Sequence, residues 1–326
     1  MTEAEWLTSS DPVAMLAFLQ HGKGTKQPWR NWGRISQRKL RLFAVACCRS
    51  VWHLLTDERS REAVEVAERF ADGLASIDEM QGVAWQAKGV GQGDSQPFEA
   101  ELAWKCASSI EQITANSGLP RWFSVSTIQA ATQASILRDI AGNVHRPVTP
   151  QWKCVSCGGS NRQQFSGGAG CGDCYPRQGF GMERAETWLT PTVVSIAKAA
   201  YQERRRKMHC RRCSGEGCSA HGMAYGGCAA GEGYEWKEDG TLDPDRLAIL
   251  ADALEDAGCT EASILNHLRG LVPCGCSNGF RDLPREGKST LVKTCRKCKG
   301  TGWITPSEPL RHWRGCWVID LLTGRQ

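Results

Sequence analysis

Three groups of four cysteines constrain this chain more than any other feature of its sequence. The chain has 17 cysteines among 326 residues, and the grouped ones lie in glycine-rich segments without a helical pattern. Two thiolates separated by two residues lie on one side of a tight turn, and two such pairs complete the tetrahedral shell of a zinc ion, so the spacing predicts about three structural zinc ions per chain. The predicted ligands are Cys154, Cys157, Cys171 and Cys174; Cys210, Cys213, Cys218 and Cys228; and Cys274, Cys276, Cys295 and Cys298.

The three groups differ in regularity. The first has CVSC and CGDC motifs separated by thirteen residues, which is a strong zinc signal. The third begins with a tighter C-x-C pair and ends with CRKC at Cys295–Cys298. The second is irregular, and His221 is an alternative ligand in place of Cys218 or Cys228, because zinc also binds imidazole. Sharing of ligands between the groups, and iron in place of zinc, stay open at this level.

Composition and charge exclude several classes of protein. Hydrophobic residues make up 41% and charged residues 23%, which is typical of a folded globular chain rather than a disordered one. The apolar runs fall short of the ~18 residues that a membrane helix needs, so no membrane partner is expected. The acidic start from Met1 to Trp6 does not resemble a secretory signal, so we expect a cytoplasmic protein with reduced thiols rather than disulfides.

Between the cysteine groups the sequence predicts helices. Asp11-Pro12, Thr190-Pro191 and Asp243-Pro244 each combine a capping side chain with a proline at the first helical position. From Ser36 to Leu55, apolar residues recur every three or four positions, which is typical of an amphipathic helix. Other predicted helices are one capped by Thr56 and ended by Gly73, one with a capping box at Ser76 and Glu79, segments 97–116 and 124–141, a short helix capped by Thr260 and ended by Gly270, and a closing helix over 316–322. The remaining cysteines are expected to pack in this helical core, and they are Cys47, Cys48, Cys106, Cys259 and Cys316.

The expected fold is mainly α: a helical scaffold that carries three small zinc knuckles or ribbons with short β-hairpins. Each insert is too short to bury a core of its own, so zinc would supply its folding free energy, roughly 10–16 kcal/mol per site. The predicted divisions are the N-terminal helical part of the scaffold, 1–150; the first zinc insert, 151–183; a scaffold helix, 184–207; the second zinc insert, 208–240; a helical hairpin, 241–270; the third zinc insert, 271–306; and a C-terminal scaffold helix, 307–326.

Two of the inserts resemble the zinc-binding repeats of DnaJ-type chaperones. CRRCSGEG at Cys210–Gly217 and CRKCKGTG at Cys295–Gly302 match the C-x-x-C-x-G-x-G repeat of that family. In that family paired repeats bind zinc and help to bind unfolded polypeptide, so the resemblance implies zinc ligation by the cysteines of both motifs. The first insert has only the first of the two expected glycines in CVSCGGSN. The sequence contains no His-Pro-Asp tripeptide, so a J-domain is not expected.

The scaffold resembles a paralogous family of helical proteins from Gemmata-like planctomycetes. The resemblance covers about half of the chain and rests on MTEAEWL at the start, RKLRLFAVACCRSVWHLLTDERSREAVEVAERFADGLA at Arg38–Ala75, ILRDIAGNVHRPVTP, WLTPTVVSIAKAAYQER, RLAILADALEDAGC and RGCWVIDLL. It implies an all-helical cytoplasmic protein in which the cysteine groups are insertions at loops. It implies no activity.

The metal sites are expected to be structural. A catalytic zinc ion keeps an open position for water, whereas a shell of four cysteines is closed. The sequence contains no H-E-x-x-H, no G-x-S-x-G and no H-x-E followed by P-C-x-x-C. We therefore expect no catalytic residues and no enzyme. The expected function is that of a zinc-binding adaptor whose inserts contact a protein partner, including an unfolded polypeptide in the manner of a chaperone.

Nucleic-acid binding is the alternative function. Basic residues cluster around the second and third inserts, and basic zinc ribbons often contact phosphates. Tyr225, Tyr234, Trp236 and Trp303 offer rings for base stacking. The competing interpretation places the arginine run in the solvated last turn of a helix over 191–206. The predicted anion-binding residues are Arg204, Arg205, Arg206, Lys207, Arg211 and Arg212, with Lys293, Arg296, Lys297 and Lys299 in the third insert.

Overall fold

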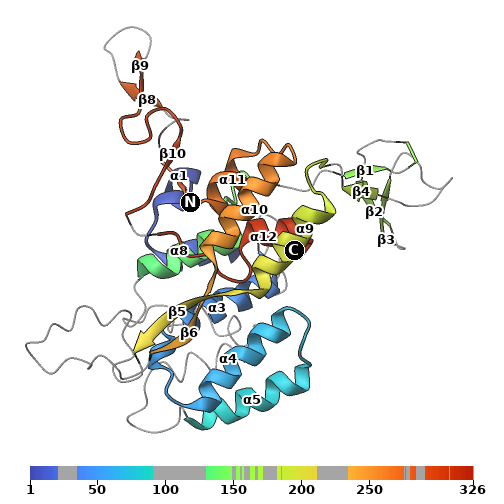
Figure 1. The fold of residues 1–326 in the computed structure, drawn as a ribbon, viewed down its shortest axis with the longest axis vertical. Helices are drawn as coiled ribbons and strands as arrows, with labels where there is room; N and C mark the ends of the chain where they lie inside the picture. Colours follow the sequence, from blue (N-terminus) through green and yellow to red (C-terminus); the bar gives the residue numbers. More distant parts are fainter. Residues whose placement is uncertain are drawn as a thin grey trace, which may run out of the picture.

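The structure, a computed structural model, is mainly helical, as the sequence predicts. Helices form a central body from which short β-hairpins project (Figure 1). The described residues are 1–20, 35–90, 130–148, 152–154, 156–157, 162–165, 168–171, 182–184, 186–210, 234–274, 276, 280–283, 291–307 and 309–325.

The first group of helices builds the N-terminal part of the scaffold. Local capping starts two of them as predicted: Asp11 Oδ1 accepts the backbone N–H groups of Val13 and Ala14, and Ser76 Oγ accepts that of Glu79. Their bounds are α1 (Glu3–Thr8), α2 (Pro12–Gln20), α3 (Gln37–Ser50), the 3-10 helix η1 (Trp52–Leu54), α4 (Glu58–Ala71), α5 (Ile77–Val90) and α8 (Ala130–Ala141).

Two of these helices differ from the prediction at their ends. The helix predicted over 36–55 ends at Ser50, because Val51 leaves the helical conformation (φ −117°, ψ 25°) and η1 follows. Helix α4 is capped by Asp57 rather than Thr56, since the Asp57 carboxylate accepts the N–H of Arg59 at 2.9 Å. The predicted helix over 97–116, and positions 124–129 of the one over 124–141, lie outside the described residues.

The second group of helices completes the scaffold. Thr190 and Asp243 cap the first two of them as predicted. Thr260 does not cap the third, because Glu261 occupies the N-cap position without a side-chain hydrogen bond. None of the helices in the described ranges combines the length and the apolar character of a membrane span. The bounds are α9 (Pro191–Gln202), α10 (Pro244–Asp256), α11 (Ala262–Leu268) and α12 (Trp317–Thr323).

The strands of the described residues form separate two-stranded antiparallel sheets. The division 184–207 contains a scaffold helix, α9, as predicted, but the helix expected over 191–206 ends at Gln202, and the arginine run lies in strand β5 rather than in the last turn of a helix. The pairs are β1 (Trp152–Cys154) with β4 (Met182–Arg184) and β2 (Arg162–Phe165) with β3 (Gly168–Cys171) in the first insert; β5 (Arg204–Cys210) with β6 (Tyr234–Leu242) in the second; and β7 (Val272–Pro273) with β10 (Trp303–Ile304) and β8 (Phe280–Leu283) with β9 (Leu291–Thr294) in the third.

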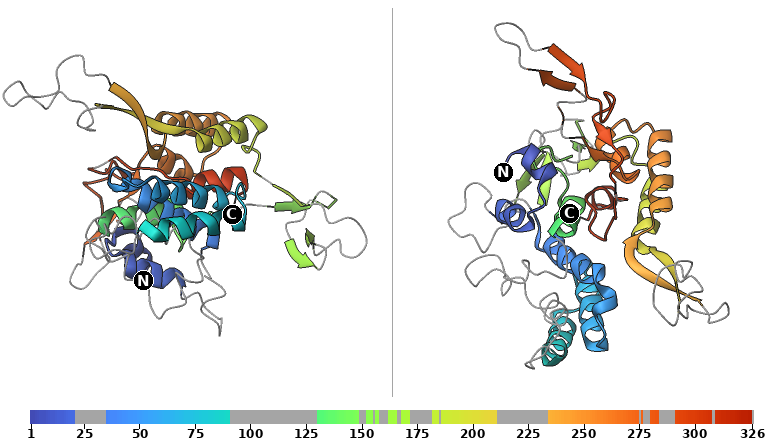
Figure 2. Two further views of the ribbon diagram at one scale, coloured as in Figure 1. Left: turned by 90° about the horizontal axis from the view of Figure 1, so that it is seen from below. Right: turned by 90° about the vertical axis from the view of Figure 1, so that its left-hand side faces the viewer.

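Apolar side chains form two cores. The first joins the helices from α1 to α5 with α8 and includes Trp6 and Phe43, both fully buried. The second joins α9 to α12 and includes Leu250 and Ile319. Helix α12 lies between the two groups of helices and contacts α8, α9 and α11 (Figure 2). The two cores therefore meet around α12.

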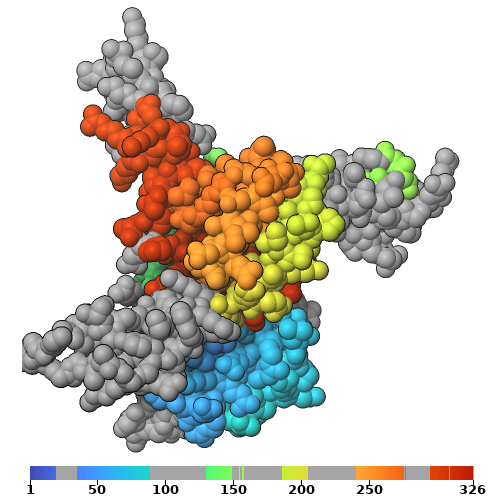
Figure 3. All heavy atoms as spheres, viewed as in Figure 1, coloured from blue at the N-terminus to red at the C-terminus, as the bar shows by residue number. Residues whose placement is uncertain are grey.

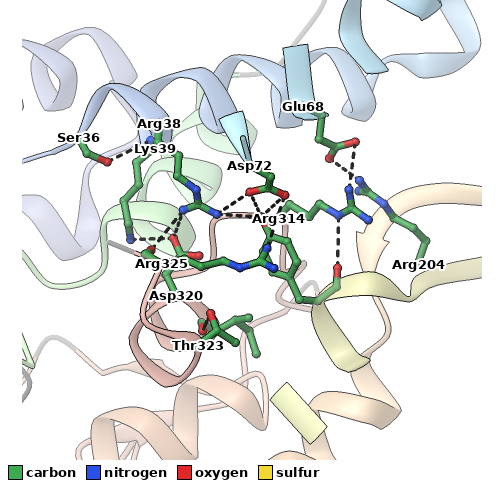
Figure 4. Close-up of polar contacts among 12 residues, drawn as sticks. Ser36, Arg38, Lys39, Glu68, Asp72, Arg204, Arg314, Asp320, Thr323 and Arg325 are labelled. Atoms are coloured by element: carbon green, nitrogen blue, oxygen red, sulfur yellow. Dashed lines mark hydrogen bonds and ion pairs between the residues drawn. The ribbon is translucent and has the colours of Figure 1, made fainter. Parts of the chain in front are cut away.

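A buried ion-pair network crosses the boundary between the cores (Figure 4). The guanidinium of Arg38 on α3 lies 2.9 Å from Asp72 at the end of α4 and 2.7 Å from Asp320 on α12, and it donates to the Tyr201 hydroxyl of α9. Removal from water lowers the pKa of Arg38, but the charge of Asp320 and the hydrogen bonds outweigh this and raise the pKa above its ordinary value. Arg38 therefore stays charged and ties four helices together.

Glu68 on α4 is the centre of a second part of this network. Its buried carboxylate lies 3.1 Å from Arg49 and 3.9 Å from Arg314, and it accepts a hydrogen bond from Arg204. Burial raises the pKa of Glu68, but the charges of Arg204 and Arg49 outweigh this and hold the pKa below its ordinary value. Through Arg204, Glu68 fixes the start of β5 on the scaffold.

Replacing Gly315 with alanine is expected to destabilise the packing of α3 against the segment before α12. Gly315 has a φ of +91°, and a Cβ there would lie 2.9 Å from Leu42 Cδ1. Gly258→Ala is the matched control, because Gly258 also has a φ of +91° but a Cβ there meets nothing within 4 Å. Overpacking typically costs about 1–3 kcal/mol, so urea titration should show that much extra loss of unfolding free energy for Gly315→Ala. Equal losses in the two variants would contradict the close contact.

Candidate metal centre

Two hairpins bring the four cysteines of the third insert together. Pairing of β7 with β10 sets Cys274 beside the end of the CRKCKGTG motif, where its N–H donates to the Gly302 carbonyl at 2.8 Å. After Cys276 the chain runs out along β8 and back along β9, and this hairpin brings it to Cys295. The third insert stands out from the scaffold (Figure 3). Cys274 and Cys276, which precede the hairpin, thus lie close to Cys295 and Cys298, which follow it.

The four sulfur atoms have the spacing of a tetrahedral zinc shell. Cys274 Sγ lies 3.7 Å from Cys295 Sγ, and Cys276 Sγ lies 3.5 Å from Cys298 Sγ. All four sulfur atoms lie within 4.8 Å of one another. Zinc–sulfur bonds of about 2.3 Å at tetrahedral angles place neighbouring sulfur atoms about 3.8 Å apart, whereas a disulfide bond is about 2.05 Å long. This group can therefore hold a metal ion.

The backbone conformation of the turn after Cys298 explains the glycines of the CRKCKGTG motif. Lys299, Gly300 and Gly302 have φ angles of 52°, 92° and 78°, in the left-handed region that side chains with a Cβ disfavour. The turn is closed by the N–H of Lys299, which donates to the Cys295 carbonyl at 2.8 Å. Glycine at two of the three positions lets this turn form without strain at each of them.

Backbone amides around Cys295 and Cys298 favour the thiolate form of these two residues, which is the form that can bind metal. The N–H groups of Cys298 and Lys297 donate to Cys295 Sγ and lower the pKa of this thiol to about 6. Removal from water raises the pKa of Cys298, but the N–H groups of the two glycines outweigh this and hold the pKa below its ordinary value. Removal from water and hydrogen bonds with neighbouring thiols raise the pKa of Cys274 to about 12. Donation to a ligating sulfur is the outer-shell contact that metal sites commonly use.

Two of the four candidate metal ligands are also the buried residues of the third insert. Among the residues of 271–306 whose burial the structure describes, Cys295 and Cys298 alone are buried. The apolar side chains of this range that are described, including Trp303, are partly exposed. With so little apolar surface removed from water, a bound ion is the main candidate for what keeps this insert folded.

The predicted ligands of the first insert are described in part. Cys154 in β1 is buried and Cys157 is exposed. The N–H of Ser156 lies 3.4 Å from Cys154 Sγ, an amide–thiol contact of the kind seen in the third insert. The backbone of Cys171 lies in β3, and Cys174 lies outside the described residues. Zinc binding by this insert stays a prediction.

The second insert is described at its base. The β5–β6 pair spans Arg204–Cys210 and Tyr234–Leu242, so its hairpin extends beyond the predicted 208–240. The backbone of Cys210 ends β5 opposite Tyr234. Zinc binding by this insert also stays a prediction, since the other predicted ligands lie outside the described residues: Cys213, Cys218, His221 and Cys228.

The predicted anion-binding residues fall into different environments. Arg204 is buried against Glu68, so its guanidinium belongs to the scaffold rather than to an exposed basic patch. In the third insert Arg296, Lys297 and Lys299 are exposed around Cys298. The structure describes the backbone, and not the side chains, of Arg205, Arg206 and Lys207 in β5 and of Lys293 in β9. Arg211 and Arg212 lie outside the described residues.

One scaffold cysteine has surroundings that the sequence did not predict. Cys47, Cys48 and Cys259 are buried in the two apolar cores as expected, and Cys106 lies outside the described residues. Cys316 is fully buried, but its Sγ lies 3.3 Å from His267 Nε2. Burial raises the pKa of the Cys316 thiol well above its ordinary value. Because the histidine lies on another element, sequence spacing gave no signal for this contact.

Comparison of the chain with protein-family models, with curated proteins and with solved structures finds no match.

Proposed function

We propose that the protein is a non-enzymatic zinc-binding adaptor of the cytoplasm, in which four-cysteine sites hold β-hairpin inserts on a helical scaffold. The observation that carries this proposal is the cluster of Cys274, Cys276, Cys295 and Cys298, whose sulfur spacing suits a tetrahedral zinc ion. Four sulfurs fill such a shell, so no position stays open for a water molecule or a substrate. The ion would therefore stabilise the insert rather than catalyse a reaction.

The arrangement of the inserts supports a role in binding a protein partner. The described hairpins project from the helical body in different directions (Figure 1). Buried ion pairs around Arg38 and Glu68 hold the body together beneath them. A rigid body with projecting hairpins suits an adaptor, and an unfolded polypeptide is the partner we propose to test first. The first and second inserts belong to the same proposal, with about three zinc ions per chain in all.

The full chain is expected to suppress the aggregation of chemically reduced insulin, measured by light scattering. Cys298→Ser should lose most of this effect, because the third insert would no longer hold zinc. Cys259→Ser is the matched control, since this buried cysteine lies in the helical core. If reduced insulin aggregates equally with and without the zinc-loaded wild-type chain, unfolded polypeptide is excluded as the partner.

Nucleic-acid binding is the second candidate, and the exposed cations Arg296, Lys297 and Lys299 favour it. Gel shifts with single- and double-stranded DNA and RNA at low salt test it. Binding through phosphates should weaken steeply between about 50 and 200 mM salt. It should also weaken in Lys297→Ala/Lys299→Ala, which keeps all four cysteines. The absence of retardation at low salt would remove this candidate.

A further inference from the structure

Four side chains with metal-binding atoms converge inside the scaffold, and none of them is a predicted ligand of the cysteine inserts. Asp139 comes from α8, His267 from the last turn of α11, and His312 and Cys316 from the segment that leads into α12. Their ligand atoms lie within 4.8 Å of one another. Asp139, His312 and Cys316 are buried, and the His267 side chain is 12% exposed.

The distances between these atoms suit a shared ion. Asp139 Oδ1 lies 3.1 Å from His267 Nε2 and 2.7 Å from His312 Nδ1. Cys316 Sγ lies 3.3 Å from His267 Nε2 and 3.9 Å from His312 Nδ1. Zinc bonds of about 2.0–2.3 Å at tetrahedral angles place neighbouring ligands roughly 3.3–3.6 Å apart, and the measured distances fall on both sides of this range. We propose that Asp139, His267, His312 and Cys316 form a mixed-ligand zinc site that joins the two halves of the scaffold.

Contacts behind the ligands hold them in position. The backbone N–H of Trp313 donates to Asp139 Oδ2 at 2.8 Å, which leaves Oδ1 facing the two histidines. The His267 ring packs edge-on against His312, with centroids 4.7 Å apart, and lies 5.2 Å from the Trp317 ring. Such contacts orient the donor atoms of a metal site before the ion binds.

The charge of the four ligands matches a divalent ion. A carboxylate, a thiolate and two neutral imidazoles carry a total charge of −2, so one zinc ion makes the buried cluster neutral. Within the described residues, the ion-pair partners of Asp139 are the two histidines, and neither lysine nor arginine pairs with it. Thiolate and imidazole ligands favour zinc over magnesium or calcium. Four protein ligands close the shell, which supports a structural role.

The cluster lies between the two cores and beside a cleft that reaches the protein surface. Asp139 belongs to a helix of the first core, whereas His267 and Cys316 belong to elements of the second. An ion bound by all of them would fasten α8 to α11 and to the start of α12. Asp139 and His267 also line a cleft of about 1890 Å³, through which an ion can reach the cluster.

Zinc content of the purified full chain tests the proposal. Cys316→Ser should bind one zinc ion fewer per chain than the wild type, while Cys259→Ser should bind as many as the wild type. Cys298→Ser/Cys316→Ser should bind two fewer, because the third insert holds a separate ion. Wild-type zinc content in a folded Cys316→Ser chain would overturn the mixed site without affecting the four-cysteine site.

A second measurement keeps the test decisive if Cys316→Ser does not fold. X-ray absorption at the zinc edge of the His221→Asn chain separates sulfur neighbours at about 2.3 Å from nitrogen and oxygen neighbours at about 2.0 Å. This background removes the alternative histidine ligand of the second insert. The mixed site predicts nitrogen or oxygen neighbours in addition to sulfur, and a shell of sulfur alone would overturn it.

Discussion

Replacing Cys298 with serine is expected to unfold the third insert and leave the helical scaffold folded. Cys295 and Cys298 are the buried side chains of this insert among those described, so little besides the proposed zinc ion would hold it together. A structural zinc ion supplies roughly 10–16 kcal/mol of binding free energy, far more than the few exposed hairpin contacts. Hydrogen–deuterium exchange should show loss of protection over 272–304 and unchanged protection in α10.

The control for this variant is Cys259→Ser, which removes a buried thiol of the second core and no predicted ligand. In Cys259→Ser the third insert should keep wild-type protection from hydrogen–deuterium exchange. Wild-type protection over 272–304 in Cys298→Ser would show that the hairpins hold the insert without the ion.

Glu68→Gln is expected to lower the free energy of unfolding by about 3–5 kcal/mol, the usual cost of leaving a buried charge without its partner. The change leaves Arg49, Arg204 and Arg314 close together without the carboxylate that they surround. Glu65→Gln on the same helix is the matched control. Glu65 is 55% exposed and lies 3.9 Å from Arg49, so its loss should cost less than about 1 kcal/mol. Equal effects in urea titration would contradict the role of the buried network.

The cost of Glu68→Gln should also depend on pH. The folded-state pKa of Glu68 lies below its ordinary value of 4.5, so its stabilising contribution is present above pH 4.5. This contribution is lost as the pH falls through the folded-state pKa. The stability difference between wild type and Glu68→Gln should therefore shrink in acid. A difference that stays constant from pH 7 to the acid limit of folding would contradict this assignment.

The parts of the fold that the sequence predicts correctly are set by short-range interactions. Helices α2, α9 and α10 begin at Asp11-Pro12, Thr190-Pro191 and Asp243-Pro244, because the capping side chain and the proline act within one turn. Strand β5 was not predicted, since its arginine-rich sequence lacks apolar alternation. What holds its start is the pair of Arg204 with Glu68, two residues 136 positions apart.

The two candidate metal sites also differ in whether their ligands lie close together in the sequence. The four cysteines of the third insert form two local pairs, so their spacing alone predicts the cluster that the structure contains. The Asp139 cluster draws its members from three separate elements, and His267 lies 128 positions from Asp139. Its one local signal is the spacing of four residues between His312 and Cys316. Sequence spacing therefore finds sites built within a turn and misses sites built by tertiary packing.

The zinc content of Cys295→Ser/Cys298→Ser, measured by native mass spectrometry of the full chain at neutral pH, tests directly whether the four cysteines of the third insert hold a zinc ion. We expect the mass to be lower than that of the zinc-loaded wild type by one zinc ion beyond the change of side chains. A double variant that carries as many zinc ions as the wild type would contradict the four-cysteine site.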